Sequence, residues 1–168
     1  VSLGALGVIT EMELDVTRAF RLAETREAIP FDAVVRDLHA IAASAEYVKL
    51  WWLPSTGKAV VFRYERTEEP ARHSRLAAAL DEVVVNRGAF EFLLRFVGTF
   101  PEATSAMNAL VAASYFGGAR RVARSDRAFN LAMAPVHRVA EWAFALDGAP
   151  DALDELRATL NKERLADL

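Results

Sequence analysis

The 168-residue chain has the length of one domain, or of one domain with a short attached piece. Its hydrophobic residues (53%) and charged residues (26%) give a globular composition, which excludes a disordered chain. The net charge of −3 argues against binding to nucleic acid, and the absence of cysteine excludes disulfides, thiolate metal sites and a cysteine nucleophile from this chain.

Two glycines, Gly4 and Gly7, stand three positions apart at the start of the chain. Glycine permits a tight turn or a close approach of the backbone to a ligand, and on spacing alone the pair indicates a turn that feeds a strand. A Rossmann phosphate loop is excluded, because its glycines follow a strand and precede a helix. Residues 6–16 turn from an apolar run to strict alternation of apolar and acidic residues, which predicts a strand with one solvated side.

A helix and a hairpin are expected next. Residues 18–25 extend the first strand or begin a second one. Pro30 opens a helical pattern, because proline is tolerated in a first turn and apolar residues follow at three- and four-residue spacing. Residues 47–53 and 59–65 are rich in β-branched and aromatic residues and predict a β-hairpin. The apolar helix positions are Phe31, Val34, Val35, Leu38 and Ile41.

Two adjacent tryptophans, Trp51 and Trp52, lie in the first hairpin strand. Alternation along a strand places them on opposite faces of the sheet. In one interpretation, one ring belongs to the core and the other packs beneath a helix. In the other, one ring lines a ligand cleft, where an aromatic face suits the C–H face of a sugar.

The middle of the chain is predicted to be helical. Residues 67–75 are polar and form a linker, and residues 74–116 form two or three helices punctuated by glycine and by Pro101. Apolar side chains surround the helix around residues 90–97, which favours core burial, with a helix on a membrane surface as the alternative. No run reaches the roughly 18 to 20 apolar residues of a spanning helix, because Arg95 interrupts the best one.

Three elements are expected at the end of the chain. Residues 119–128 carry four arginines and little apolar content, which predicts a loop. Residues 136–146 predict a strand, and residues 148–151 begin a final helix. The buried face of that helix is formed by Leu153, Leu156 and Leu160. This order of elements predicts an α+β fold, in which helices pack on one face of an antiparallel sheet.

His137 and Glu141 are polar residues within the largely apolar strand predicted over residues 136–146, which also contains Arg138. A carboxylate there costs free energy unless it has a partner or faces a solvated cleft. Glu141 therefore lies either on the solvated face, paired with a neighbour such as Arg138, or at a substrate cleft. His137 is a structural residue or a substrate-side residue.

Three segments together resemble the L-gulono-1,4-lactone and D-arabinono-1,4-lactone oxidase family, flavoenzymes of the vanillyl-alcohol oxidase superfamily. Residues 1–9 (VSLGALGVI) are similar to the end of the family's FAD-binding domain. Residues 46–54 look like its Ser-Glu-Tyr/Phe…Trp-Trp/Phe-x-Pro hairpin, and residues 129–143 look like its Phe-Asn-x-x-Cys-x-Phe-x-Gln-x-Val-x-Glu/Asp-Trp-Ala segment. The resemblance spans nearly the whole chain, although residues 68–118 are only loosely similar.

Four positions depart from the family's pattern. The family has Cys, Phe, Gln and Pro at positions that are here occupied by Met133, Pro135, His137 and Ala145. These differences bear on the identity of the substrate more than on the fold.

The resemblance implies a division into two parts. Residues 1–16 would end the FAD-binding domain and supply a strand left over from it, and residues 17–168 would form the substrate-binding cap domain, truncated at its C-terminus. Val1 stands where an initiator methionine is expected, so we expect a longer parent chain. Lys162-Glu163-Arg164 is not the family's substrate-binding Glu-x-Arg pair, which we expect beyond the final helix.

The resemblance also implies roles for individual residues. Gly4, Gly7, Val8 and Ile9 match the backbone segment that runs along the FAD. Trp51, Trp52, His137 and Glu141 are the substrate-side residues that we expect, and the catalytic residues are expected outside this chain. No metal site is expected.

The implied activity is oxidation of a sugar-1,4-lactone by hydride transfer to flavin, with oxygen or another acceptor. This chain alone would be inactive, and its partner would be the FAD-binding domain of the same parent chain. An FAD-dependent polyol or alcohol dehydrogenase, or a free-standing ligand-binding α+β domain, is the alternative. We expect a cytoplasmic protein, with a protein peripheral to a membrane as the less favoured case. We also expect that an unpaired strand edge favours association of two chains.

Overall fold

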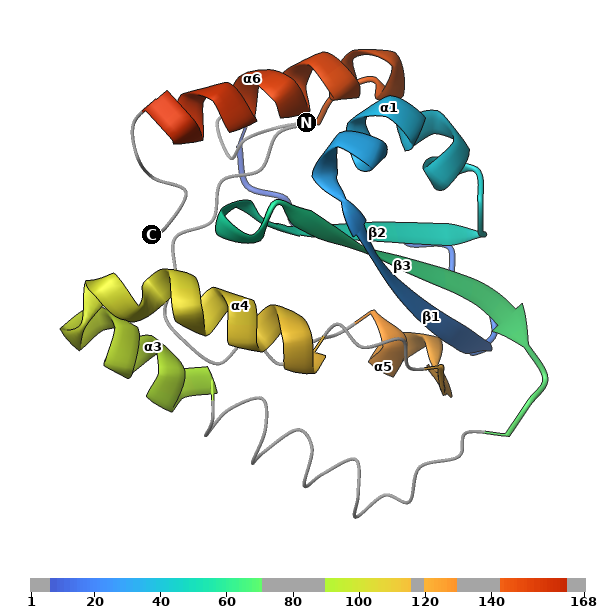
Figure 1. Ribbon diagram of the computed structural model, residues 1–168. Coiled ribbons are helices and arrows are strands. Elements are labelled where there is room, and N and C mark those ends of the chain that lie inside the picture. The colour runs from blue at the N-terminus through green and yellow to red at the C-terminus, as the bar shows by residue number, and fades with distance from the viewer. Residues whose placement is uncertain (1–6, 71–89, 116–119, 130–142, 163–168) are drawn as a thin grey trace.

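The computed structural model describes residues 7–70, 90–115, 120–129 and 143–162 (Figure 1). Four antiparallel strands form one sheet in the order β2-β3-β1-β4, which confirms the α+β class with an antiparallel sheet. The strands are β1 (Arg21–Pro30), β2 (Tyr47–Leu53), β3 (Lys58–Thr67) and β4 (Arg121–Arg124). Strands β2 and β3 are the predicted hairpin, closed by a 3₁₀ turn over Pro54–Thr56 and by Gly57 at φ +61°.

Helices α1 (Phe31–Ala42) and α6 (Ala149–Lys162) lie on one face of this sheet, as predicted (Figure 1). The α1 residues Phe31, Val34, Leu38 and Ile41 are buried against Ala59 and Val61 of β3. Leu153 of α6 packs on the same cluster, whereas Leu156 is 47% exposed, so its predicted burial was wrong. Helix α6 contacts α1, and its residues Ala149 and Leu153 pack against the cluster.

The opposite face of the sheet has its own apolar cluster. It is formed by Leu22, Val60, Phe62, Tyr64, Ala123 and Ala128. Ala128 belongs to the short helix α5 (Ser125–Ala128), so a helical residue packs on this face too.

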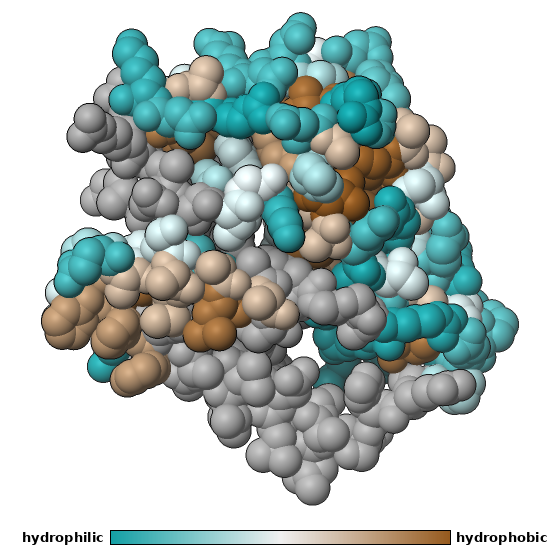
Figure 2. All heavy atoms as spheres, viewed as in Figure 1, coloured by the Kyte–Doolittle hydropathy of each residue, from teal (hydrophilic) through white to brown (hydrophobic). Residues whose placement is uncertain are grey.

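Helices α3 (Phe90–Thr99) and α4 (Thr104–Tyr115) confirm helical structure in the described part of the middle segment. A 3₁₀ turn over Pro101–Ala103 separates them, and the Thr104 hydroxyl donates a hydrogen bond to the Pro101 carbonyl. Figure 2 shows hydrophobic residues gathered on this helix pair, where Phe92 is 70% and Leu110 is 58% exposed. No helix in the described ranges is long and apolar enough to cross a membrane.

Three predictions of secondary structure were wrong within the described residues. Residues 119–128 were predicted to be a loop, but β4 and α5 lie there, because Val122 and Ala123 are buried beside β1. The strand predicted over residues 6–16 is not formed: residues 7–20 have no regular secondary structure and no neighbouring strand among the described residues. Residues 143–145 are likewise not in a strand, and a 3₁₀ turn over Leu146–Gly148 follows them.

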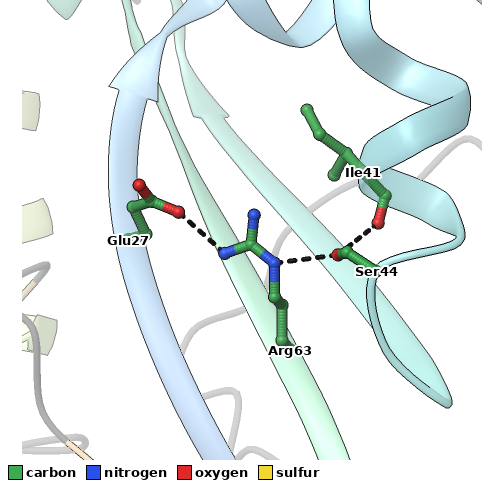
Figure 3. A network of polar contacts seen from close by, with 4 residues as sticks. All are labelled: Glu27, Ile41, Ser44 and Arg63. Atoms are coloured by element: carbon green, nitrogen blue, oxygen red, sulfur yellow. Dashed lines mark hydrogen bonds and ion pairs between the residues drawn. The ribbon is translucent and has the colours of Figure 1, made fainter.

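A polar network ties the end of α1 to the sheet (Figure 3). Arg63 of β3 donates hydrogen bonds to the Glu27 carboxylate of β1 and to the Ser44 hydroxyl, both at 2.8 Å. The Ser44 hydroxyl in turn donates to the carbonyl of Ile41 at 2.6 Å. This network links the end of α1 to strands β1 and β3.

Candidate functional site

Charged and aromatic side chains meet on the sheet face opposite α1. The strand register places Arg26 of β1 beside Phe62 of β3, and Phe62 beside Lys49 of β2. Because side chains alternate along a strand, Glu24 and Trp51 point to the same face as these three residues. We call Glu24, Arg26, Lys49, Trp51 and Phe62 the site face.

Glu24 and Arg26 form a buried ion pair on this face. Glu24 is only 5% exposed and the Arg26 side chain is 14% exposed, and the Arg26 Nε donates a hydrogen bond to the Glu24 carboxylate. The Arg26 guanidinium also lies 5.4 Å from the centre of the Phe62 ring. A buried charge costs free energy unless it is paired, and here each ion compensates the other.

Lys49 is the second cation of the site face. Its ammonium lies 4.8 Å from the centre of the Trp51 ring and 4.8 Å from the centre of the Phe62 ring. Burial lowers the pKa of Lys49, the Glu24 carboxylate opposes that shift, and the Arg26 charge adds to it. Within the part of the chain that the structure describes, this ammonium has no hydrogen bond and no ion pair.

The two tryptophans point to opposite faces, as the alternation predicted. Trp51 meets Phe62 edge to face, with ring centres 5.4 Å apart, on the site face. Trp52 stacks on Phe31 of α1 with ring centres 4.0 Å apart, beneath the helix. Its indole nitrogen is buried and has no hydrogen-bond partner among the described residues. The geometry thus leaves Trp51, and not Trp52, on the charged face.

The backbone around Gly7 is open. Gly7 has φ +124°, a conformation that side chains disfavour, and a Cβ there would meet no atom within 4 Å. Val8 is 90% and Ile9 is 63% exposed. Such a segment fits a backbone that a cofactor approaches closely, and its role in holding FAD stays a prediction. Gly4 lies outside the described residues.

His137 and Glu141 also lie outside the described residues, so their predicted substrate-side roles stay predictions. Nowhere in the described ranges does a group of His, Asp or Glu have the arrangement needed to hold a metal ion.

Sequence reasoning missed Glu24, Arg26 and Lys49. The signal was present, because Glu24 and Arg26 are two positions apart and follow the apolar Leu22 with strand periodicity. Lys49 is likewise two positions from Trp51. What the sequence did not supply was the pairing of β1 with β3, which brings the two segments to one face.

Comparisons with known proteins find relatives along nearly the whole chain. The family model described as D-arabinono-1,4-lactone oxidase matches residues 12–167. D-arabinono-1,4-lactone oxidase of Eremothecium gossypii is 28% identical over 97% of this chain and 33% of its own length. The Kluyveromyces lactis enzyme of the same name is 27% identical with the same coverage, and L-gulonolactone oxidase of Scyliorhinus torazame is 28% identical over 95% of this chain and 36% of its own. The chain thus spans about a third of these relatives.

Proposed function

This chain belongs to the D-arabinono-1,4-lactone oxidase family, and on that premise we propose that it is the substrate-side part of an FAD-dependent sugar-1,4-lactone oxidoreductase. The relatives that it matches are named as oxidases of arabinono- and gulonolactone. The proposed substrate is therefore a five-membered sugar lactone, and the proposed electron acceptor is oxygen or another oxidant.

One observation carries the proposal beyond the family: a sheet face that combines buried charge with aromatic rings. Ligand sites in proteins are mostly apolar, with a small number of placed polar groups that fix orientation. The site face has this composition, with Lys49, Arg26 and Glu24 set among Trp51 and Phe62. On the opposite face, the buried cluster consists of apolar side chains of α1 and β3.

In this proposal the chain binds and orients substrate, and the cofactor performs the redox step. When bound, FAD supplies the acceptor for the hydride that leaves the substrate's alcohol carbon. Gly7, Val8 and Ile9, together with Gly4, would lie along the cofactor, where main-chain N–H and C=O groups can bond it. The site face would hold the lactone and exclude water from one side of it.

The proposed partner is the FAD-binding domain of the same parent chain. Residues 7–18 are exposed along their whole length, and their apolar side chains include Val8 at 90% and Val16 at 91% exposure. A segment whose apolar side chains are exposed is stabilised when it docks on a neighbouring structure. We propose that these residues pair within the flavin domain, and that without it they favour association of two chains.

Deleting residues 1–14 should leave the remaining domain folded and more monomeric. Residues 7–14 are exposed, so we expect the free energy of unfolding to change by less than about 0.5 kcal/mol. Thermal melting and sedimentation of the deleted and intact chains measure both quantities. Loss of a cooperative melting transition on deletion would show that this segment belongs to the domain core.

An FAD-dependent oxidation of a polyol or simple alcohol is the second candidate function. The departures at Met133, Pro135 and His137 favour it, because they fall in a segment that resembles the family's substrate side. The test is to purify the full-length protein and to measure flavin reduction with D-arabinono-1,4-lactone, L-gulono-1,4-lactone and the corresponding alditols. Faster reduction by a lactone supports the first proposal, and reduction by alditols alone supports the second.

The last part of the proposal concerns the localisation of the protein. We propose a cytoplasmic protein in which helices α3 and α4 pack within the parent chain. The exposure of Phe92 and Leu110 keeps contact with a membrane surface as the alternative.

A further inference from the structure

We propose that Lys49 is a substrate-binding residue, whose ammonium donates hydrogen bonds to oxygen atoms of the sugar lactone while the Trp51 ring packs on the lactone's C–H face. In this arrangement Arg26 and Glu24 are positioning residues. The inference rests on the proposed function and adds the residues that would recognise the substrate.

The state of the Lys49 ammonium is the first argument. A lysine ammonium has three N–H donors, and those of Lys49 have no hydrogen-bond acceptor among the described residues. The rings of Trp51 and Phe62, each centred 4.8 Å away, stabilise the charge but accept no conventional hydrogen bond. A half-buried cation in this state is stabilised when a ligand brings oxygen acceptors to it, and the hydroxyl and carbonyl oxygens of a lactone are such acceptors.

The ion pair beside Lys49 is the second argument. Arg26 and Glu24 neutralise each other, so they leave Lys49 as the unpaired charge of the site face. The Glu24 carboxylate attracts the ammonium and Arg26 repels it. The pair therefore biases the position of the ammonium without competing for its donors, which is the role of a positioning residue.

The Trp51 ring is the third argument. It shares one face of the sheet with Lys49, two positions away on β2, and its edge-to-face contact with Phe62 fixes its orientation. A small sugar ring has an apolar C–H face and a polar rim of oxygen atoms. The Trp51 ring matches the apolar face, and the Lys49 ammonium, 4.8 Å from the centre of that ring, matches the polar rim.

The test compares Lys49→Met, Lys49→Arg and Lys58→Met in the full-length protein. Lys58 is an exposed lysine of the same hairpin, so Lys58→Met controls for loss of charge alone. KM and kcat are measured for the lactone that the wild-type protein oxidises best. Binding of the lactone is measured separately through tryptophan fluorescence with the flavin reduced, a readout that does not depend on turnover.

We expect Lys49→Met to raise KM and the dissociation constant by about 10- to 100-fold, the loss typical of a hydrogen bond from a charged group. Lys49→Arg should recover most of this loss, and Lys58→Met should match wild type. If wild type oxidises the lactone and Lys49→Met binds it as tightly as Lys58→Met does, the inference is wrong while the proposed function stands. If wild type oxidises no lactone, both are wrong.

Discussion

Replacing Phe31 by alanine should destabilise the fold by about 3 to 5 kcal/mol, the cost typical of removing a buried phenylalanine. Phe31 is 3% exposed and stacks on Trp52 with ring centres 4.0 Å apart. Its backbone N–H also donates to the Gly57 carbonyl at 3.0 Å, which joins the first turn of α1 to the hairpin loop. Loss of the ring leaves a cavity between α1 and the sheet, while that backbone bond remains.

Thermal and urea unfolding of the chain measure this effect. For a chain of this size, each kcal/mol lowers the melting temperature by roughly 2 to 4 °C. Phe92→Ala is the matched control, because Phe92 is 70% exposed and the same atoms are removed. Equal melting temperatures for the two variants would show that α1 does not pack on the sheet as described.

Replacing Arg26 by methionine should be destabilising to a similar extent, roughly 3 to 5 kcal/mol, because it leaves the Glu24 carboxylate buried without its cation. Glu24 is 5% exposed, so water cannot fully hydrate its carboxylate once the Arg26 charge is lost. The double variant Glu24→Leu with Arg26→Met should recover most of this loss, since an apolar pair of similar volume has no charge to compensate.

Arg36→Met is the matched control for the loss of an arginine. Arg36 pairs with Asp37 on the surface, where the two side chains are 70% and 46% exposed, so that change should leave the unfolding curve unaltered. If Arg26→Met and Arg36→Met behave alike, or if the double variant is less stable than Arg26→Met, the pair is not a compensated buried ion pair.

The sequence was sufficient for elements with a strong local pattern. Helix α1 repeats apolar residues at three- and four-residue spacing after Pro30, and the hairpin joins two β-rich runs across a short loop, so both could be predicted. Strand β4 could not, because only Val122 and Ala123 are apolar and arginines flank them. Its strand structure depends on pairing with β1, which is a contact between segments far apart in the chain.

Residues 7–16 are the opposite case, because they have a strong strand pattern and yet form no strand. Its alternation is clear, yet alternation specifies a strand only when a neighbouring strand accepts its backbone hydrogen bonds. The described residues supply no such neighbour, and the segment is exposed.

The candidate site was predictable only in part. Trp51 and Trp52 were both candidates from a resembling motif, and strand alternation placed them on opposite faces without showing which face carries the charged residues. The ion pair of Glu24 and Arg26 was not identified, because burial of a charge depends on the strands and side chains around it and not on its own spacing. The sheet register is what places these residues beside Lys49.

The central claim is that the site face, and not the sheet face beneath α1, binds the lactone. Substitutions of the two adjacent tryptophans of β2 test this claim most directly. Trp51→Leu and Trp52→Leu make the same chemical change at neighbouring positions that point to opposite faces. KM for the lactone, measured in both variants of the full-length protein, should rise roughly 3- to 10-fold for Trp51→Leu, the scale of one aromatic contact, and stay at the wild-type value for Trp52→Leu. A raised KM for Trp52→Leu with an unchanged KM for Trp51→Leu would contradict the account.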